Sequence, residues 1–186
     1  MHAVDDAALD DAIGDARGAL LVTRHGGVVT LELHRPERRN AISYAMWVAL
    51  GRVLPLLAID DDVDVVVLRG TPGGPFSAGA DISEFATLRS TPESAAAYGE
   101  AVTGGERAII DFPKPTMALV QGWAVGGGTQ VAAACDLRIC DTTSQFGVTP
   151  AKLGIVYALP STARLVDVVG RSWASWFLLT GEFVDA

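Results

Sequence analysis

The chain has 186 residues, of which 49% are hydrophobic, and its formal net charge is −8 at pH 7. That length predicts one domain with a real hydrophobic core, and the acidic balance argues against nucleic acid as a partner. The cysteines Cys135 and Cys140 match neither a zinc-binding spacing nor a disulfide framework, so we expect reduced thiols and no metal site. No stretch is apolar for long enough to cross a membrane, and the first residues lack the features of a secretory signal. We therefore expect a soluble, cytoplasmic protein with no membrane partner.

An acidic, weakly patterned stretch opens the chain. Residues 1–18 are predicted to form a flexible N-terminal arm, which leaves 19–186 as the core domain. Two β-rich runs, at 20–24 and 28–33, flank a glycine turn and predict a β-hairpin.

Helices and strands alternate along the rest of the chain. Ser43 is a good N-cap for a helix that runs toward Ile59, and Pro55 is expected to kink that helix or end it early. Thr91 is placed as the N-cap of another helix, with Pro92 at its first position. The remaining predictions are a strand at 63–68, a helix from about 82, a strand at 116–120, a helix at 129–135, a strand at 137–140 and a last helix at 173–180. This alternation is typical of a layered α/β fold.

Two glycine-rich loops share one arrangement, in which a buried strand leads into glycines and then into a helix. The first loop spans 71–81 and the second spans 122–128. Such loops expose backbone N–H groups at a helix N-terminus, where donors of this kind can stabilise an oxyanion. Neither loop has the Lys-Ser/Thr of a P-loop or the glycine spacing of a dinucleotide site. From the residues alone, two simple tight turns remain an equal alternative.

These two loops carry a family resemblance. Residues 76–82 (Phe-Ser-Ala-Gly-Ala-Asp-Ile) and 122–128 (Gly-Trp-Ala-Val-Gly-Gly-Gly) resemble two loops of the enoyl-CoA hydratase/isomerase (crotonase) superfamily. Further motifs of that superfamily occur in the expected order, namely Arg39-Asn40-Ala41, Pro113-Lys114-Pro115, Cys135-Asp136-Leu137-Arg138, Phe146-Gly147, Leu153-Gly154 and Leu179-Thr180-Gly181-Glu182. The resemblance covers about 20–186. It implies an α/β fold, a crotonase (ClpP-like) spiral of ββα units, with its C-terminal helical part truncated.

The resemblance also implies a site. The backbone N–H groups of Ala78 and Gly127 would form an oxyanion hole around a thioester carbonyl as an enolate develops. The substrate would be an acyl thioester of coenzyme A, and no cofactor would be permanently bound. Family members use C-terminal helices to build trimers, often paired as hexamers, so a homotrimer or hexamer is expected where those helices are present. The pantetheine and adenine of CoA would lie along two segments that contribute Arg38, Arg39, Ala41, Ala80, Asp81 and Ile82.

Two positions depart from the hydratase pattern. Hydratases of this superfamily use two glutamates to position and activate water, and the aligned residues here are Gln130 and Pro150. Neither side chain can take a proton from water in the ordinary pH range. The pattern around Thr149 and Tyr157 resembles the methylmalonyl-CoA decarboxylase group, in which loss of CO₂ would leave the enolate without a strong base. Thr149 would then orient the substrate carboxylate and Tyr157 would line the same pocket, although Ala80 stands where that group has a histidine.

Plainer explanations exist for several of these residues. Thr149 could be the N-cap of a helix that starts at Pro150, and Tyr157 could be a packed aromatic residue. Asp81 and Asp136 are interpreted as acceptors that fix loops through backbone N–H groups. The carboxylates without an assigned place, any of which could supply a base, are Glu84, Glu100, Glu106 and Asp111.

Two other function classes compete with a CoA-thioester lyase or isomerase as explanations of this sequence. A Ser–His–Asp hydrolase is disfavoured, because the chain has no G-x-S-x-G elbow and its histidines all lie in the N-terminal part. A non-catalytic homologue that binds acyl-CoA remains open, since both hydratase glutamates are missing. The intact glycines of the two loops argue against that alternative.

Overall fold

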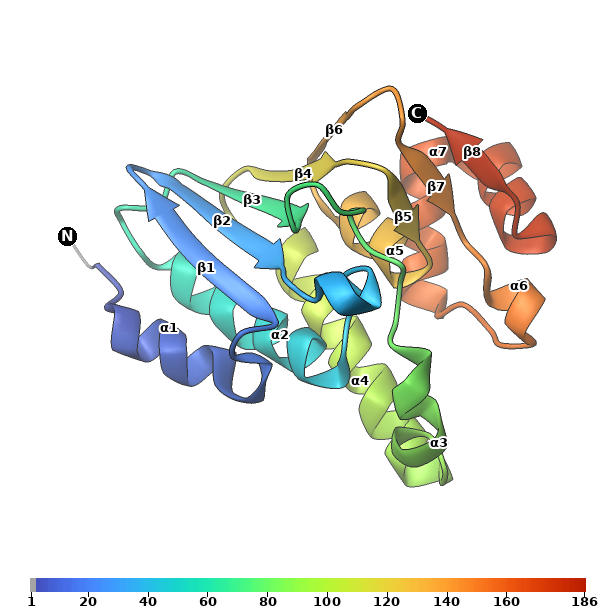
Figure 1. The fold of residues 1–186 in the computed structure, drawn as a ribbon, viewed down its shortest axis with the longest axis horizontal. Coiled ribbons are helices and arrows are strands. Elements are labelled where there is room, and N and C mark those ends of the chain that lie inside the picture. Colours follow the sequence, from blue (N-terminus) through green and yellow to red (C-terminus); the bar gives the residue numbers. More distant parts are fainter. Residues whose placement is uncertain (1–2) are drawn as a thin grey trace.

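The computed structural model describes residues 3–186, which form two sheets with helices packed against them (Figure 1). The larger sheet has the spatial order β1-β2-β3-β4-β6, with β1 Leu20–His25, β2 Val28–Leu33, β3 Val65–Gly70, β4 Thr116–Val120 and β6 Leu137–Cys140. The smaller sheet has the order β5-β7-β8, with β5 Trp123–Val125, β7 Gln145–Gly147 and β8 Phe183–Asp185. The α/β prediction is confirmed.

The predicted hairpin is present as β1 and β2. Its register runs from Leu20 opposite Leu33 to His25 opposite Val28, which leaves two glycines as the turn. The pairs β2–β3, β3–β4 and β4–β6 are parallel. Parallel strands need a crossover connection, and helices supply it here. These helices are α2 Tyr44–Ala58, α4 Pro92–Ile110 and α5 Gly127–Ala134.

Helix α2 lies against the sheet and begins as predicted, with the Ser43 hydroxyl accepting from the Met46 N–H. The prediction that Pro55 would kink or shorten it is wrong in one respect, because the helix continues to Ala58. A proline inside a helix costs about 3 kcal/mol. Leu54 and Leu57 are fully buried beyond the middle of the helix, Leu57 in its last turn, and burial of one such side chain contributes about 1.5–3 kcal/mol. Packing therefore holds the last turn in place.

The N-terminal region is a helix rather than a flexible arm. Helix α1 (Asp6–Ile13) is capped by Asp5 and continues into a 3₁₀ turn at Gly14–Ala16. It packs against α2 (Figure 1) and places four apolar side chains in the core. Those side chains are Leu9, Ala12, Ile13 and Ala16. The prediction of an arm is wrong for 3–18, and its first two residues lie outside the described part of the chain. The apolar residues recur at helical spacing, a pattern that the many Ala and Asp residues conceal.

The remaining helices follow the first glycine loop and the smaller sheet. The first loop leads into a 3₁₀ turn at Ile82–Glu84 and then α3 (Phe85–Leu88), and the Thr91 capping box opens α4 as predicted. The smaller sheet leads into α6 (Pro150–Leu153) and α7 (Leu159–Thr180), which begins well before the predicted helix and kinks at Gly170. None of the helices in the described chain combines the length and apolar character needed to cross a membrane.

Candidate active site

The two glycine loops pack backbone against backbone. Ser77 pairs with the second loop, donating its N–H to the Trp123 carbonyl and accepting from the Val125 N–H at 2.9 and 3.0 Å. A Cβ on Gly79, whose φ is +101°, would lie 2.7 Å from the Val125 carbonyl oxygen. A Cβ on Gly128 would lie 2.7 Å from the Ser77 carbonyl oxygen. Only glycine permits this approach at either position, so both residues fix where the loops meet.

Most backbone N–H groups of the first loop already have partners. The Ala78 N–H donates to the Arg39 carbonyl at 3.0 Å, and the Gly79 N–H donates to the Ser77 hydroxyl at 3.1 Å. Ala78 is therefore not the donor that the sequence predicted, because pairing of this loop with the preceding segment uses its N–H. Within residues 3–186, no such partner exists for the N–H of Ala80 or for that of Gly127.

The two unpaired donors are close neighbours. A Cβ on Gly127 would lie 3.3 Å from the Ala80 nitrogen. Gly127 is the first residue of α5, so its N–H is one of the helix donors that have no intrahelical acceptor and carries part of the positive end of the helix dipole. All residues of α5 are buried, which fixes this end of the helix. Two backbone donors without a partner among the described residues thus lie beside one another.

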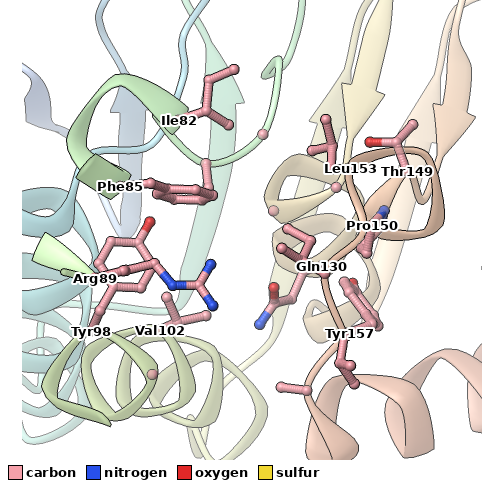
Figure 2. Close-up of a pocket in the computed structure, with 18 of the residues that line it drawn as sticks. Ile82, Phe85, Arg89, Tyr98, Val102, Gln130, Thr149, Pro150, Leu153 and Tyr157 are labelled. Atoms are coloured by element: carbon pink, nitrogen blue, oxygen red, sulfur yellow. The ribbon is translucent and has the colours of Figure 1, made fainter. Parts of the chain in front are cut away.

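A cavity of roughly 290 Å³ lies beside these donors. One wall comes from α3 and α4, and the opposite wall comes from α5, α6 and the segment before α7 (Figure 2). Among the described residues that line it there is no Asp, Glu or His, and Arg89 is the one charged side chain. The lining residues used below are Trp47, Ala80, Ile82, Phe85, Arg89, Tyr98, Val102, Gly127, Gln130, Thr149, Pro150, Leu153 and Tyr157.

The structure brings together the other residues that the sequence predicted as catalytic. Gly127, Gln130, Thr149 and Tyr157 all line this cavity, as does Pro150. The Thr149 side chain makes no capping hydrogen bond to α6, and its hydroxyl points toward the cavity in Figure 2. Thr149 thus stands at the N-cap position of a helix that starts at Pro150, as that explanation predicts, without capping it through its side chain. Tyr157 is half-buried, and burial together with the nearby charge of Glu106 raises the pKa of its phenol.

Gln130 is held by a buried carboxyl group behind the cavity wall. Its amide nitrogen donates to Glu106 Oε2 at 2.8 Å and to Ser161 Oγ at 2.9 Å. The Ser161 hydroxyl donates to the same Glu106 oxygen at 2.6 Å. Because both amide hydrogens are used, Gln130 offers only its carbonyl oxygen, an acceptor, to the cavity.

Glu106 is 2% exposed, and burial raises the pKa of its carboxyl group against the opposing effects of Ser161, Gln130 and the charge of Arg164. Its Oε1 has no hydrogen-bond partner in the described part of the chain. Sequence reasoning left this residue without a place. The signal was available, because Glu106 shares one face of α4 with apolar residues at helical spacing, namely Tyr98, Val102 and Ile109.

Two of the predicted CoA-binding residues line the cavity. Ala80 does so, and Ile82 lies at the cavity wall with 61% of its surface exposed. Arg38 and Arg39 are exposed on the neighbouring segment, which pairs with the first loop through the Ile42–Ala80 bridge. The two predicted segments therefore lie side by side.

The other two predicted CoA-binding residues have structural contacts. Ala41 is buried, and its carbonyl accepts from Arg35 at 2.9 Å. Asp81 forms an ion pair with Arg35 at 2.8 Å and accepts from the N–H and hydroxyl of Ser83. Burial alone would raise the pKa of Asp81, but these partners outweigh it and lower that pKa. Asp81 fixes its loop, as expected, and Asp136 does the same by accepting from Thr116.

Residues 3–186 hold no cluster of three or more His, Cys, Asp or Glu side chains suited to a metal ion. Both cysteines are free thiols, with Cys135 buried and Cys140 exposed.

Comparison with known proteins identifies the fold and the family. Residues 23–186 match the family model for enoyl-CoA hydratase/isomerase. The chain belongs to the enoyl-CoA hydratase/isomerase family. Solved structures confirm the predicted crotonase fold. One is an enoyl-CoA hydratase/carnithine racemase from Magnetospirillum magneticum, with a TM-score of 0.87 and 36% sequence identity. The match covers 90% of this chain and 63% of that protein. An enoyl-CoA hydratase from Mycobacterium smegmatis has a TM-score of 0.84 and 37% identity, with 65% of that protein and 90% of this chain covered.

Relatives known by sequence have similar names. A 2,3-dehydroadipyl-CoA hydratase of Escherichia coli is 34% identical over 167 residues, which is 90% of this chain and 64% of the relative. The chain spans 52% to 64% of the length of the first curated relatives that it matches. The activity of a whole family member is therefore carried to this chain only as a proposal.

Proposed function

We propose that this protein acts on acyl thioesters of coenzyme A by stabilising an enolate between the N–H groups of Ala80 and Gly127. The observation that carries the proposal is the convergence of these two unpaired donors beside a cavity. As the enolate forms, the thioester oxygen gains negative charge, and fixed donors stabilise that charge without reorganising. Loss of one such donor lowers the rate by about a hundred- to a thousand-fold in other enzymes.

The CoA part of the substrate would follow the paired segments at the mouth of the cavity. Ile82 offers an exposed apolar surface for the pantetheine, and Arg38 and Arg39 are exposed cations suited to phosphates. Asp81 would act indirectly by holding the loop that carries the Ala80 N–H. No permanently bound cofactor is part of this proposal.

A decarboxylase is the second candidate, favoured by the absence of any acid or base among the described lining residues. Hydration needs a group that takes a proton from water, whereas Gln130 and Pro150 stand at the two positions where the resemblance places glutamates. In a decarboxylation, the bond between Cα and the carboxylate breaks and its electrons move into the thioester carbonyl. CO₂ leaves, and Cα then takes a proton from water. The hydroxyls of Thr149 and Tyr157 would orient the carboxylate.

The test is a turnover assay of the purified chain with crotonyl-CoA and with methylmalonyl-CoA. The first is followed by loss of its conjugated-thioester absorbance and the second by mass for loss of CO₂. Turnover of either one supports enolate stabilisation, and decarboxylation alone selects the second candidate. Hydration alone overturns the decarboxylase candidate and directs attention to Glu106, behind Gln130. Binding of both thioesters without turnover of either one favours a different acyl chain or an acyl-CoA-binding protein.

We also propose that the protein assembles as a homotrimer or hexamer where the C-terminal helices of the family are present, in a reducing cytoplasmic setting that suits its free thiols. Large apolar side chains are exposed on one edge of the main sheet and on α7, and such surface supports association. These side chains are Leu137, Ile139, Trp173, Trp176 and Leu179. Sedimentation equilibrium tests the assembly, and a monomer at all concentrations would contradict it.

A further inference from the structure

The cavity contains one cation that no carboxylate neutralises. Arg89 follows α3, and its guanidinium carbon lies 4.8 Å from the centre of the Phe85 ring and 5.7 Å from that of Tyr98. Within residues 3–186, no Asp or Glu forms an ion pair or hydrogen bond with it. Arg89 is exposed to water, yet it lines the cavity of a chain with net charge −8 and is free to pair there with an anionic group of a ligand. A guanidinium beside aromatic rings is suited to a carboxylate or a phosphate.

The neighbouring tyrosine has an unsatisfied hydroxyl group. Tyr98 is 5% exposed, lines the same cavity and stacks with Tyr44, and its Oη has no hydrogen-bond partner in the described part of the chain. An unpaired buried hydroxyl is costly, so an acceptor supplied by a ligand would be favourable. Burial, together with the negative charges of Glu84 and Asp81, raises the pKa of Tyr98 to about 12, against the effect of Arg89. The phenol therefore stays protonated and remains a donor at neutral pH.

We propose that Arg89 and Tyr98 bind a carboxylate at the far end of the acyl group, so that the preferred substrates are CoA monothioesters of dicarboxylic acids. This inference rests on the proposed function, because it assumes that the cavity holds the acyl part. Figure 2 shows Arg89 beside Phe85 and Tyr98 on one wall, pointing across the cavity toward the wall that carries Gln130. A terminal methyl group would leave the guanidinium and the phenol unpaired, whereas a terminal carboxylate would accept from both. This carboxylate is retained in the product, unlike one lost as CO₂.

The phosphates of CoA are the rival anion for Arg89, and a binding experiment separates the two. Saturated thioesters are used because they lack the conjugated double bond and cannot be hydrated. Affinities are measured by titration calorimetry for butyryl- and succinyl-CoA, for pentanoyl- and glutaryl-CoA, for hexanoyl- and adipyl-CoA, and for free CoA. Each pair differs only in whether a methyl group or a carboxylate ends the chain. The expected result is that at least one dicarboxylic thioester binds about tenfold or more tightly than its partner, because a charge-assisted hydrogen bond is stronger than a neutral one.

Two variants and a control connect that preference to the site. Arg89→Met is expected to abolish the preference and Tyr98→Phe to reduce it about three- to tenfold, while butyryl-CoA binding stays within about twofold. The control is Arg107→Met, which removes an arginine that is 77% exposed on α4 and should leave every affinity unchanged. Retained butyryl-CoA binding also shows that each variant is folded.

The possible failures are distinguishable. Equal affinities within every pair would overturn the carboxylate inference and leave the proposed function intact. Equal weakening of all thioesters and of free CoA by Arg89→Met would overturn it in favour of a phosphate contact. Failure of the unaltered protein to bind any thioester would overturn the proposed function, and the inference with it.

Discussion

Replacing Gly79 by alanine tests whether close packing of the two loops creates the donor pair. The new Cβ would lie 2.7 Å from the Val125 carbonyl oxygen, well inside normal contact, and the backbone there has φ +101°. The positive φ costs about 1–2 kcal/mol for a residue with a Cβ. Pushing the second loop away by a few tenths of an ångström adds strain of about 1–2 kcal/mol. The free energy of unfolding should therefore fall by about 2–4 kcal/mol, which lowers Tm by about 4–16 °C in a domain of this size.

Activity should fall further than stability alone explains. The displaced segment carries Gly127, so its N–H would no longer align with that of Ala80. Below the melting range, kcat for whichever thioester is turned over should fall about a hundred- to a thousand-fold, as when one oxyanion donor is lost. KM should change by less than about threefold, because the N–H pair acts mainly on the developing charge.

The matched control is Gly73→Ala. Gly73 also has a positive φ, of +79°, but a Cβ there meets nothing within 4 Å. This variant should lose about 1–2 kcal/mol of stability from the backbone alone and keep its kcat. The reasoning is refuted if Gly79→Ala keeps kcat within about threefold of the unaltered protein, or if Gly73→Ala is equally inactive.

Three further predictions concern single side chains. Burial raises the pKa of Glu106 above its ordinary value of 4.5, so the native state holds that proton to higher pH than the unfolded state and stability falls as pH rises from 4.5 through the raised pKa. Glu106→Gln should remove this fall in a Tm-against-pH series, and an unchanged slope would contradict it. The pH dependence at Asp81 has the opposite sign, because its lowered pKa gives stability that is lost as pH falls below 3.8. Asp81→Asn should lower the free energy of unfolding in urea by about 1–3 kcal/mol, because it leaves Arg35 without its ion pair, and no change would show that the pair is dispensable. Ser43→Ala removes the N-cap of α2 and should lower Tm by about 2–4 °C without changing kcat, whereas a loss of activity would show that the cap also positions the site.

Local sequence patterns predicted many elements because short-range chemistry controls them. The hairpin follows from β-rich runs around two glycines, and the starts of α2 and α4 follow from Ser43 and Thr91, whose hydroxyls accept from N–H groups three residues on. The positions of Gln130 and Thr149 on the cavity wall were predicted through the family motifs. Local sequence patterns gave wrong predictions where tertiary packing outweighed them. This happened at Pro55 inside α2 and in the N-terminal helix, whose burial against α2 decides its structure.

The sequence by itself determined the fold class, the family and the two glycine loops, because each depends on residue types at fixed spacing. The tertiary structure alone decided which N–H groups are free. Pairing of the first loop with the preceding segment uses the Ala78 N–H, and the close approach of the loops at Gly79 and Gly128 places the Ala80 N–H beside that of Gly127. The contacts of Glu106 were decided in the same way. Helical spacing on α4 indicates that Glu106 faces the core, but its partners Gln130 and Ser161 are distant in sequence, so only the fold brings them to its carboxyl group.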